Sequence, residues 1–193
     1  MALKEKSDIK QMTLEIDRRI YNRVNIKNKK FFGLASRLKD SSGKVLNFSD
    51  LHRSVEDGEI SFYDDRYNLV WFHRIDSISF EKKKGVYGRS SLSQIGRASG
   101  VSVFWAKRAS MNLQNERFDL YQYDLLSYLL NALSDVEEYE IQKVDFDIQN
   151  IENQEFSAKK LHKESLLLKF DFLLHFQPNI CSDACTEWDC CDL

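Results

Sequence analysis

The sequence predicts an α+β fold: a mostly antiparallel sheet with two amphipathic helices packed on one face and a long protruding loop or hairpin. Two segments, residues 7–25 and 117–136, repeat apolar side chains every three or four positions, as amphipathic helices do. Several other segments alternate apolar and polar residues with the period of a strand. They follow one another without a regular strand–helix–strand order, which argues against an all-parallel sheet.

The chain has the size and composition of one globular domain. It has 193 residues, of which 42% are hydrophobic and 30% charged, and a single proline. We expect one domain over residues 1–178 and a cysteine-rich acidic tail over 179–193. No apolar run reaches the roughly 18 residues of a membrane span, and the first residues lack the apolar run of a secretory signal. We therefore expect a non-secreted protein without membrane contact.

The first half of the chain predicts one helix followed by strands. Ser7 or Asp8 can accept hydrogen bonds from the free N–H groups at the start of helix 7–25. The apolar stripe of this helix comprises Ile9, Met12, Ile16, Ile20 and Val24. Strands are expected at residues 29–38, 45–51 and 69–80, with turn signals at 40–43 and 57–58.

Residues 82–100 are expected to form the protruding loop or hairpin. They contain four of the seven glycines of the chain, which we interpret as a source of mobility. From Val101 onward the alternation of apolar side chains resumes, so the chain returns as a strand.

The second half predicts a helix and two strands. After helix 117–136, residues 139–151 are expected to form a strand with Val144, Phe146 and Ile148 on one face, followed by a polar connection over 150–162. In the last strand, 164–176, every even-numbered residue from Leu166 onward is apolar and is assigned to the core. The odd-numbered face is mixed. Its Leu167 and Leu173 indicate either a contact with another subunit or an ordinary second face covered by a loop or the tail.

The four cysteines lie at Cys181, Cys185, Cys190 and Cys191, all within the tail. Their spacing does not match the paired C-x2-C pattern of structural zinc sites. We favour free thiols over a zinc site or a disulfide, and expect no cofactor.

No group of residues has the spacing of a catalytic site. The histidines His52, His73, His162 and His175 are dispersed, and the serines fall in no nucleophile motif. Asp145 and Asp147 share one face of the expected strand, as in a metal-dependent nuclease, but a solvated face explains them more simply. We expect that the protein is not an enzyme.

The charge distribution is uneven although the net charge is only −2. Residues 82–115 contain no acidic side chain, whereas the later chain and the tail are acidic. The basic residues of this stretch are Lys82, Lys83, Lys84, Arg89, Arg97, Lys107 and Arg108. Segment 82–108 therefore suits either a nucleic acid or an acidic surface on another copy, which favours head-to-tail contacts. A solvated loop is the third interpretation.

This organisation resembles the tail-terminator and tail-completion proteins of tailed bacteriophages, which form rings at the head–tail neck. The resemblance rests on the order of the elements over residues 7–177: an N-terminal amphipathic helix at 9–24, a sheet with a protruding hairpin at 82–100, then F-D-L-Y-Q-Y-D-L-L-S-Y-L-L-N-A-L, V-D-F-D-I-Q-N-I-E-N-Q-E-F and L-L-L-K-F-D-F-L-L-H-F. The composition, rich in Lys, Phe, Asn and Ser, is similar to that of crAss-like phages. The cysteine-rich tail departs from the pattern.

The resemblance implies a structural virion protein without catalysis, assembled in the host bacterial cytoplasm. It implies a homo-oligomeric ring that contacts adjacent neck, portal or tail proteins, with Leu167 and Leu173 at the subunit contact. The basic loop would face the DNA channel, in passive contact with DNA, or the neighbouring ring. The alternative function is a small nucleic-acid-binding module that uses segment 82–108.

Overall fold

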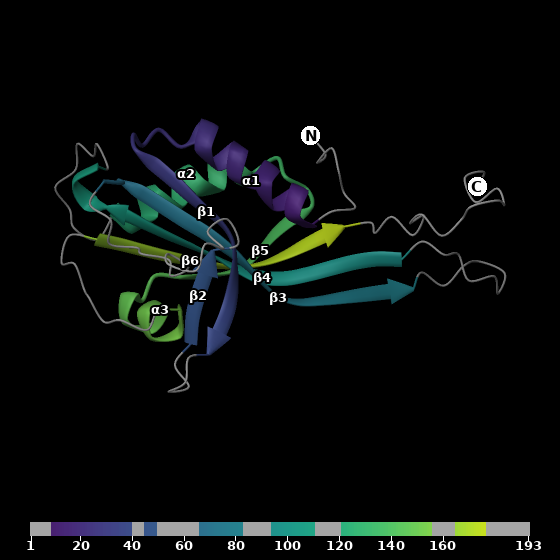
Figure 1. The fold of residues 1–193 in the computed structure, drawn as a ribbon. Coiled ribbons are helices and arrows are strands. Elements are labelled where there is room, and N and C mark those ends of the chain that lie inside the picture. Colours follow the sequence, from purple (N-terminus) through teal and green to yellow (C-terminus); the bar gives the residue numbers. More distant parts are fainter. Residues whose placement is uncertain are drawn as a thin grey trace.

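The computed structural model describes residues 9–39, 45–49, 66–82, 94–110, 121–155 and 165–176. These residues form a six-stranded sheet in the order β2-β1-β3-β4-β6-β5, together with three α-helices (Figure 1). All neighbouring strands run antiparallel except β1 and β3, which are parallel. The predicted α+β class and mostly antiparallel sheet are confirmed. The expected turns at 40–43 and 57–58 lie outside the described residues.

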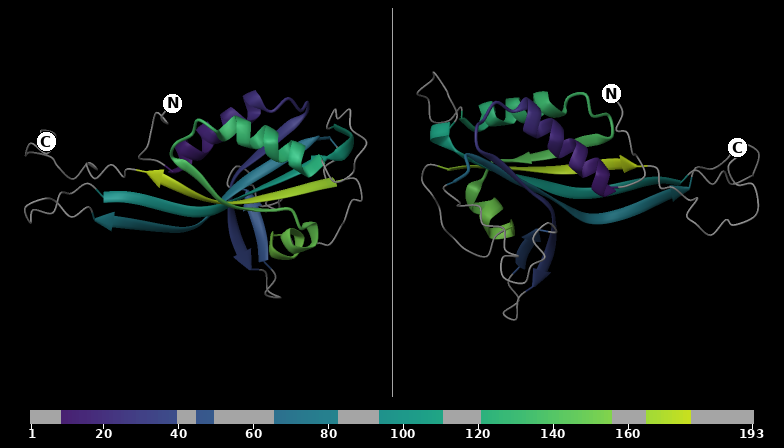
Figure 2. Two further views of the ribbon diagram at one scale, coloured as in Figure 1. Left: turned by 180° about the vertical axis from the view of Figure 1, so that it is seen from behind. Right: turned by 45° about the horizontal axis from the view of Figure 1, so that its top comes forward.

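Helices α1 (Ile9–Arg23) and α2 (Tyr121–Leu133) lie side by side on one face of the sheet, as predicted (Figures 1 and 2). We call this side of the sheet the helix-pair face. Arg19 and Arg23 of α1 both donate to the Asp135 carboxylate just after α2, over 3.0 Å and 2.8 Å. The predicted apolar stripe of α1 is buried at Met12, Ile16, Ile20 and Val24. The main core therefore lies between this helix pair and the sheet.

The long C-terminal strand is confirmed as β6 (Ser165–Phe176). It lies inside the sheet, between β4 and β5. Its even-numbered side chains all belong to the main core, as predicted: Leu166, Leu168, Phe170, Phe172, Leu174 and Phe176.

The predicted strand over 139–151 is wrong in its second half. Strand β5 ends at Asp145 (Tyr139–Asp145), and helix α3 (Ile148–Glu155) begins three residues later. The Asp147 carboxylate accepts hydrogen bonds from the backbone N–H groups of Gln149 and Asn150, at 3.0 Å and 3.2 Å. This N-cap satisfies donors that a helix start leaves free, so the chain turns into a helix where strand alternation would have continued.

Helix α3 covers the opposite face of the sheet, which we call the α3 face (Figure 2). Ile151 is fully buried there in a second core that includes Leu167 of β6. The predicted pair of helices on one face is thus joined by a third helix on the other, and both faces of the sheet are covered in its central part.

Strand β1 (Lys29–Lys39) leaves the sheet partway along its length. It pairs with β3 only as far as Leu34 opposite His73, with a register shift after Phe31. Gly33 lies in this shift with a φ of 88°, a conformation that favours glycine. Beyond it β1 pairs with β2 (Val45–Ser49) in a hairpin that points away from β3 (Figure 1). Strand β3 therefore has no neighbour on its outer side after His73 among the described strands.

Strands β3 (Leu69–Lys82) and β4 (Gln94–Lys107) run on past the helices as a projecting extension (Figures 1 and 2). We call residues 75–82 and 94–100 the arm. Of the two forms expected for residues 82–100, a loop or a hairpin, the hairpin applies to 94–100, because Gln94 to Gly100 pair with β3 and, from Gly96, also with β6. The tip of the hairpin, 83–93, and the tail lie outside the described residues.

Candidate functional site

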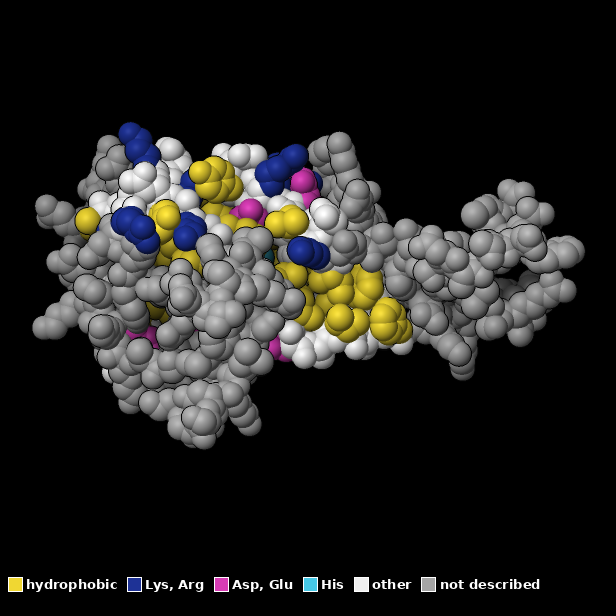
Figure 3. Space-filling model, in the orientation of Figure 1, with side chains coloured by type: hydrophobic (Ala, Val, Ile, Leu, Met, Phe, Trp, Pro, Cys, Tyr) yellow, Lys and Arg dark blue, Asp and Glu magenta, His cyan; other side chains and the backbone are white. Residues whose placement is uncertain are grey.

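The arm has one apolar face, and this face is exposed along β3. Ile78 lies opposite Ala98 and Phe80 lies opposite Gly96 in the β3–β4 ladder, which places both side chains on the helix-pair face. Ile78 is 51% exposed and Phe80 is 54% exposed. Figure 3 shows hydrophobic side chains gathered where the strands leave the helices. Two large side chains exposed side by side on a strand are uncommon on a protein that remains alone.

Two glycines let aromatic and backbone groups approach the arm closely. A Cβ added at Gly96 would lie 2.3 Å from the ring of Phe176, and a Cβ added at Gly100 would lie 2.1 Å from the carbonyl oxygen of Arg74. Both positions lie in strand β4. The mobility inferred from these two glycines is therefore wrong: they are required for close packing.

The other face of the arm is polar. The hydroxyls of Ser77 and Ser99 are hydrogen-bonded at 2.7 Å, and Arg97 lies in register with Ser79 on one side and His175 on the other. The imidazole of His175 in turn lies 3.5 Å from the Glu140 carboxylate. The arm is thus an amphipathic piece of sheet, apolar toward the helix-pair side and polar toward the α3 side.

The predicted basic residues whose side chains the structure describes do not form one patch. Arg97 lies on the arm, whereas Lys107 and Arg108 lie at the opposite end of β4, where the Arg108 guanidinium covers the Tyr121 ring at 5.5 Å. Lys82 is the last residue of β3, and its side chain is not described. Lys83, Lys84 and Arg89 lie outside the described residues.

The two leucines assigned to a subunit contact have different environments. Leu167 is 1% exposed and belongs to the second core, so helix α3 and its own sheet already cover it. Leu173 is half-buried, in register with Ser99 of β4 and Glu140 of β5. Of the two earlier interpretations, the ordinary second face accounts for Leu167.

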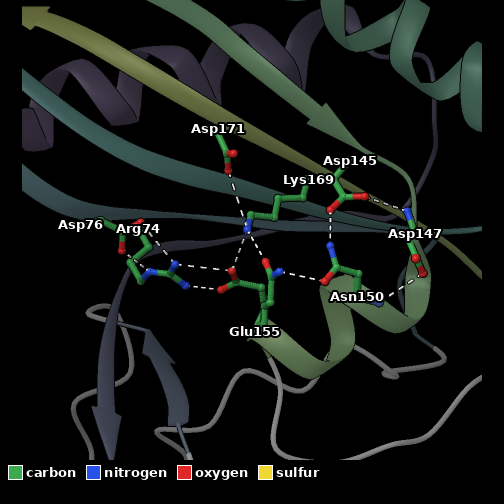
Figure 4. Close-up of polar contacts among 9 residues, drawn as sticks. Arg74, Asp76, Asp145, Asp147, Asn150, Glu155, Lys169 and Asp171 are labelled. Atoms are coloured by element: carbon green, nitrogen blue, oxygen red, sulfur yellow. Dashed lines mark hydrogen bonds and ion pairs between the residues drawn. The ribbon is translucent and has the colours of Figure 1, made fainter.

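A polar pocket of about 430 Å³ lies at the base of the arm, on the α3 face. Its walls carry three charged side chains that are almost completely buried: Arg74, Glu155 and Lys169 (Figure 4). Asp76 and Asp171 lie at its rim, and their side chains are 41% and 39% exposed. The sequence analysis missed this group, because its residues come from β3, α3 and β6 and only the fold brings them together.

The charged side chains of this pocket are paired with one another. The Glu155 carboxylate accepts from the Arg74 guanidinium, and the Lys169 ammonium lies 3.2 Å from Glu155 and 2.8 Å from the Gln154 amide oxygen. Burial alone would lower the pKa of Arg74, but its hydrogen bonds to Asp76 and Glu155 raise it. Arg74 is therefore charged, and the network fastens α3 to the sheet.

A second buried polar group lies within the main core. The Ser102 hydroxyl is 2.6 Å from Nδ1 of His73 and 2.7 Å from the Tyr139 hydroxyl. Burial lowers the pKa of His73 to about 3 and raises that of Tyr139, so both are neutral near pH 7. His73 is 1% exposed and Ser102 is fully buried. All three side chains of the group are buried, and we assign the group a structural role.

Asp145 and Asp147, considered above as a metal-binding pair, are engaged in the start of α3. Asp145 accepts from the backbone N–H of Asp147 at 2.9 Å and from the Asn150 amide at 2.7 Å. Within the described ranges, no three His, Cys, Asp or Glu side chains cluster closely enough to hold a metal ion. The four cysteines fall outside those ranges.

None of the helices in the described part of the chain is long and apolar enough to cross a lipid bilayer. No protein family and no curated protein matches the chain in sequence. The α+β fold and the amphipathic arm place the chain in a broad class: sheet proteins with an exposed strand extension.

Proposed function

We propose that the protein is a structural subunit that associates with copies of itself, without catalysis, in a ring at the head–tail neck or tail end of a phage virion. The observation that carries the self-association is the arm, whose exposed Ile78 and Phe80 lie on a strand with no outer neighbour among the described strands. Natural proteins protect such apolar edges, and burial in an assembly is one means of doing so.

The ring and the phage location rest on the order of the elements in the sequence. The described structure is compatible with this order, since an N-terminal helix, a projecting strand pair, a second helix and a long final strand are all present. Adjacent neck, portal or tail proteins are the expected partners, and the virion is the expected location. The dispersal of Arg97, Lys107 and Arg108 does not favour the alternative of a nucleic-acid-binding module.

The test is the mass of the purified full chain in solution, measured by light scattering and by negative-stain imaging. We expect closed particles of defined subunit number. The double variant Ile78→Ser/Phe80→Ser should shift the mass toward the monomer, because it removes the exposed apolar side chains from the arm.

The matched control is Leu130→Ser, which changes a 41% exposed leucine on α2, away from the arm. It should leave the mass unchanged. A wild-type protein that stays monomeric at high concentration, alone and with phage neck components added, would overturn the proposal. Equal effects of the arm and control variants would show that the arm is not the contact.

A further inference from the structure

Among the described residues, the sheet has two free edges on opposite sides. One is the outer edge of the arm, residues 75–82 of β3, which lost its neighbour where β1 turned away at Gly33. The other is the outer edge of β5, which pairs with β6 alone among the described strands. Each presents backbone N–H and C=O groups that a further strand can pair with.

These two edges run in opposite directions. Strand β3 is antiparallel to β4, β4 to β6, and β6 to β5, so β5 is antiparallel to β3. When a second copy lies beside the first in a similar orientation, its β5 edge meets the arm as an antiparallel neighbour. That is the pairing direction the rest of the sheet already uses, apart from β1–β3.

The side chains of the two edges also match face by face. On the helix-pair face β5 carries Tyr139, Ile141 and Val144, all packed on or within the main core, and the arm carries Ile78 and Phe80. On the α3 face β5 carries Glu140 and Lys143, and the arm carries serines. The pairing places apolar beside apolar and polar beside polar, whereas a slip by one residue would reverse this.

From this we infer that the arm of one copy pairs with the outer edge of β5 of a second copy, so that the sheet continues across the subunit boundary. This inference rests on the self-association proposed above and names its two surfaces. Because the two surfaces differ, the contact is head-to-tail, which is the kind that builds rings. A twofold pairing of arm with arm would leave both β5 edges open.

The test uses cysteine cross-linking in a full chain whose four tail cysteines are replaced by serine. One chain carries Ser79→Cys on the arm and the other carries Lys143→Cys on β5. Both positions are exposed and both point to the α3 face. A short bifunctional maleimide is added to each variant alone and to the mixture, after light scattering has shown that each variant retains the wild-type mass.

We expect a covalent dimer only in the mixture, and a ladder of higher species when one chain carries both cysteines. Gln11→Cys, on the exposed surface of α1, is the control partner and should not be linked to Lys143→Cys. Linkage of Ser79→Cys to itself would overturn the inference in favour of a twofold contact. An oligomer without the 79–143 link would overturn the inference and leave the proposed function standing. A protein that stays monomeric at high concentration, alone and with phage neck components added, would overturn both.

Discussion

Phe80 and Phe176 meet edge to face at the end of the sheet, with ring centroids 5.8 Å apart and an interplanar angle of 76°. Phe80 belongs to the exposed arm, and Phe176 is the last residue of β6 and only 5% exposed. The contact joins the apolar face of the arm to the main core. The arm is thus a continuation of the folded body, and its packing can be tested with substitutions.

Replacement of Gly100 by alanine should destabilise the protein more than the same change at Gly96. The added methyl at residue 100 meets a backbone carbonyl oxygen, that of Arg74, at 2.1 Å, and the backbone cannot move without disturbing the ladder. At residue 96 it meets the Phe176 ring, which can rotate away. Overpacking usually lowers the free energy of unfolding by about 1–3 kcal/mol. We expect the destabilisation by Gly100→Ala to lie at or above the upper end of this range. Urea unfolding of both variants measures the difference, and equal losses would contradict the prediction.

Removal of the Glu155 charge should be strongly destabilising. In Glu155→Gln the buried Arg74 and Lys169 lose the carboxylate that they share. Loss of one partner of a buried ion pair typically costs about 3–5 kcal/mol. Asp171→Asn is the control. The Asp171 carboxylate is 39% exposed and lies 3.7 Å from the Lys169 ammonium, so its removal should lower the stability only slightly. Denaturant midpoints that fall equally in both variants would refute a special role for Glu155.

The cap of helix α3 depends on Asp147. Asp147→Ala removes the acceptor of the Gln149 and Asn150 N–H groups, and such a change costs about 1 kcal/mol. Asp147→Ser retains a capping oxygen and should restore most of the loss. Hydrogen exchange of the α3 amides provides the readout. Unchanged exchange in Asp147→Ala would mean that α3 does not need this cap.

Asp17 should make the protein less stable at high pH. Burial raises the pKa of this half-buried carboxyl from 3.8 to about 7 in the folded protein. The folded state therefore keeps its proton over a range in which the unfolded chain has lost it. This contribution is fully present below pH 4 and is lost as the pH rises through 7.

Asp17→Asn removes this titration. Its stability relative to the wild type should accordingly be greater at pH 8 than at pH 4, because only the wild type must ionise a buried carboxyl. Urea midpoints of both proteins at the two pH values give the comparison. A constant difference between them would place the pKa of Asp17 near its ordinary value.

The elements that the sequence predicted well are those in which local pattern and burial agree. Strand β6 alternates because one face lies under two helices, and α1 repeats every three or four residues because one side contacts the sheet. Leu167 was harder to interpret, since its cover is α3, an element that the strand pattern of 139–151 concealed. The sequence D-I-Q-N at 147–150 held the missing signal, a capping residue directly before a short helix.

The polar pocket could not be predicted in the same way. Lys169 lies on the odd-numbered face of β6, which is mixed in sequence, and Arg74 follows His73 on β3, just after an apolar run. Their burial follows from the placement of Glu155 above them by α3. The local sequence does not distinguish a charged side chain that faces water from one that faces an opposite charge on another helix or strand.

Strand β6 follows every other described strand in the chain, yet it lies between two of them. During synthesis, β4 lacks its second neighbour, and β5 lacks the strand with which it pairs, until residues 165–176 have emerged. Before then, the apolar faces of β4, α1 and α2 lack the six even-numbered side chains of β6 that complete their core. The domain is therefore completed late in synthesis. Contacts between residues distant in sequence form last, and proteins that depend on such contacts fold slowly.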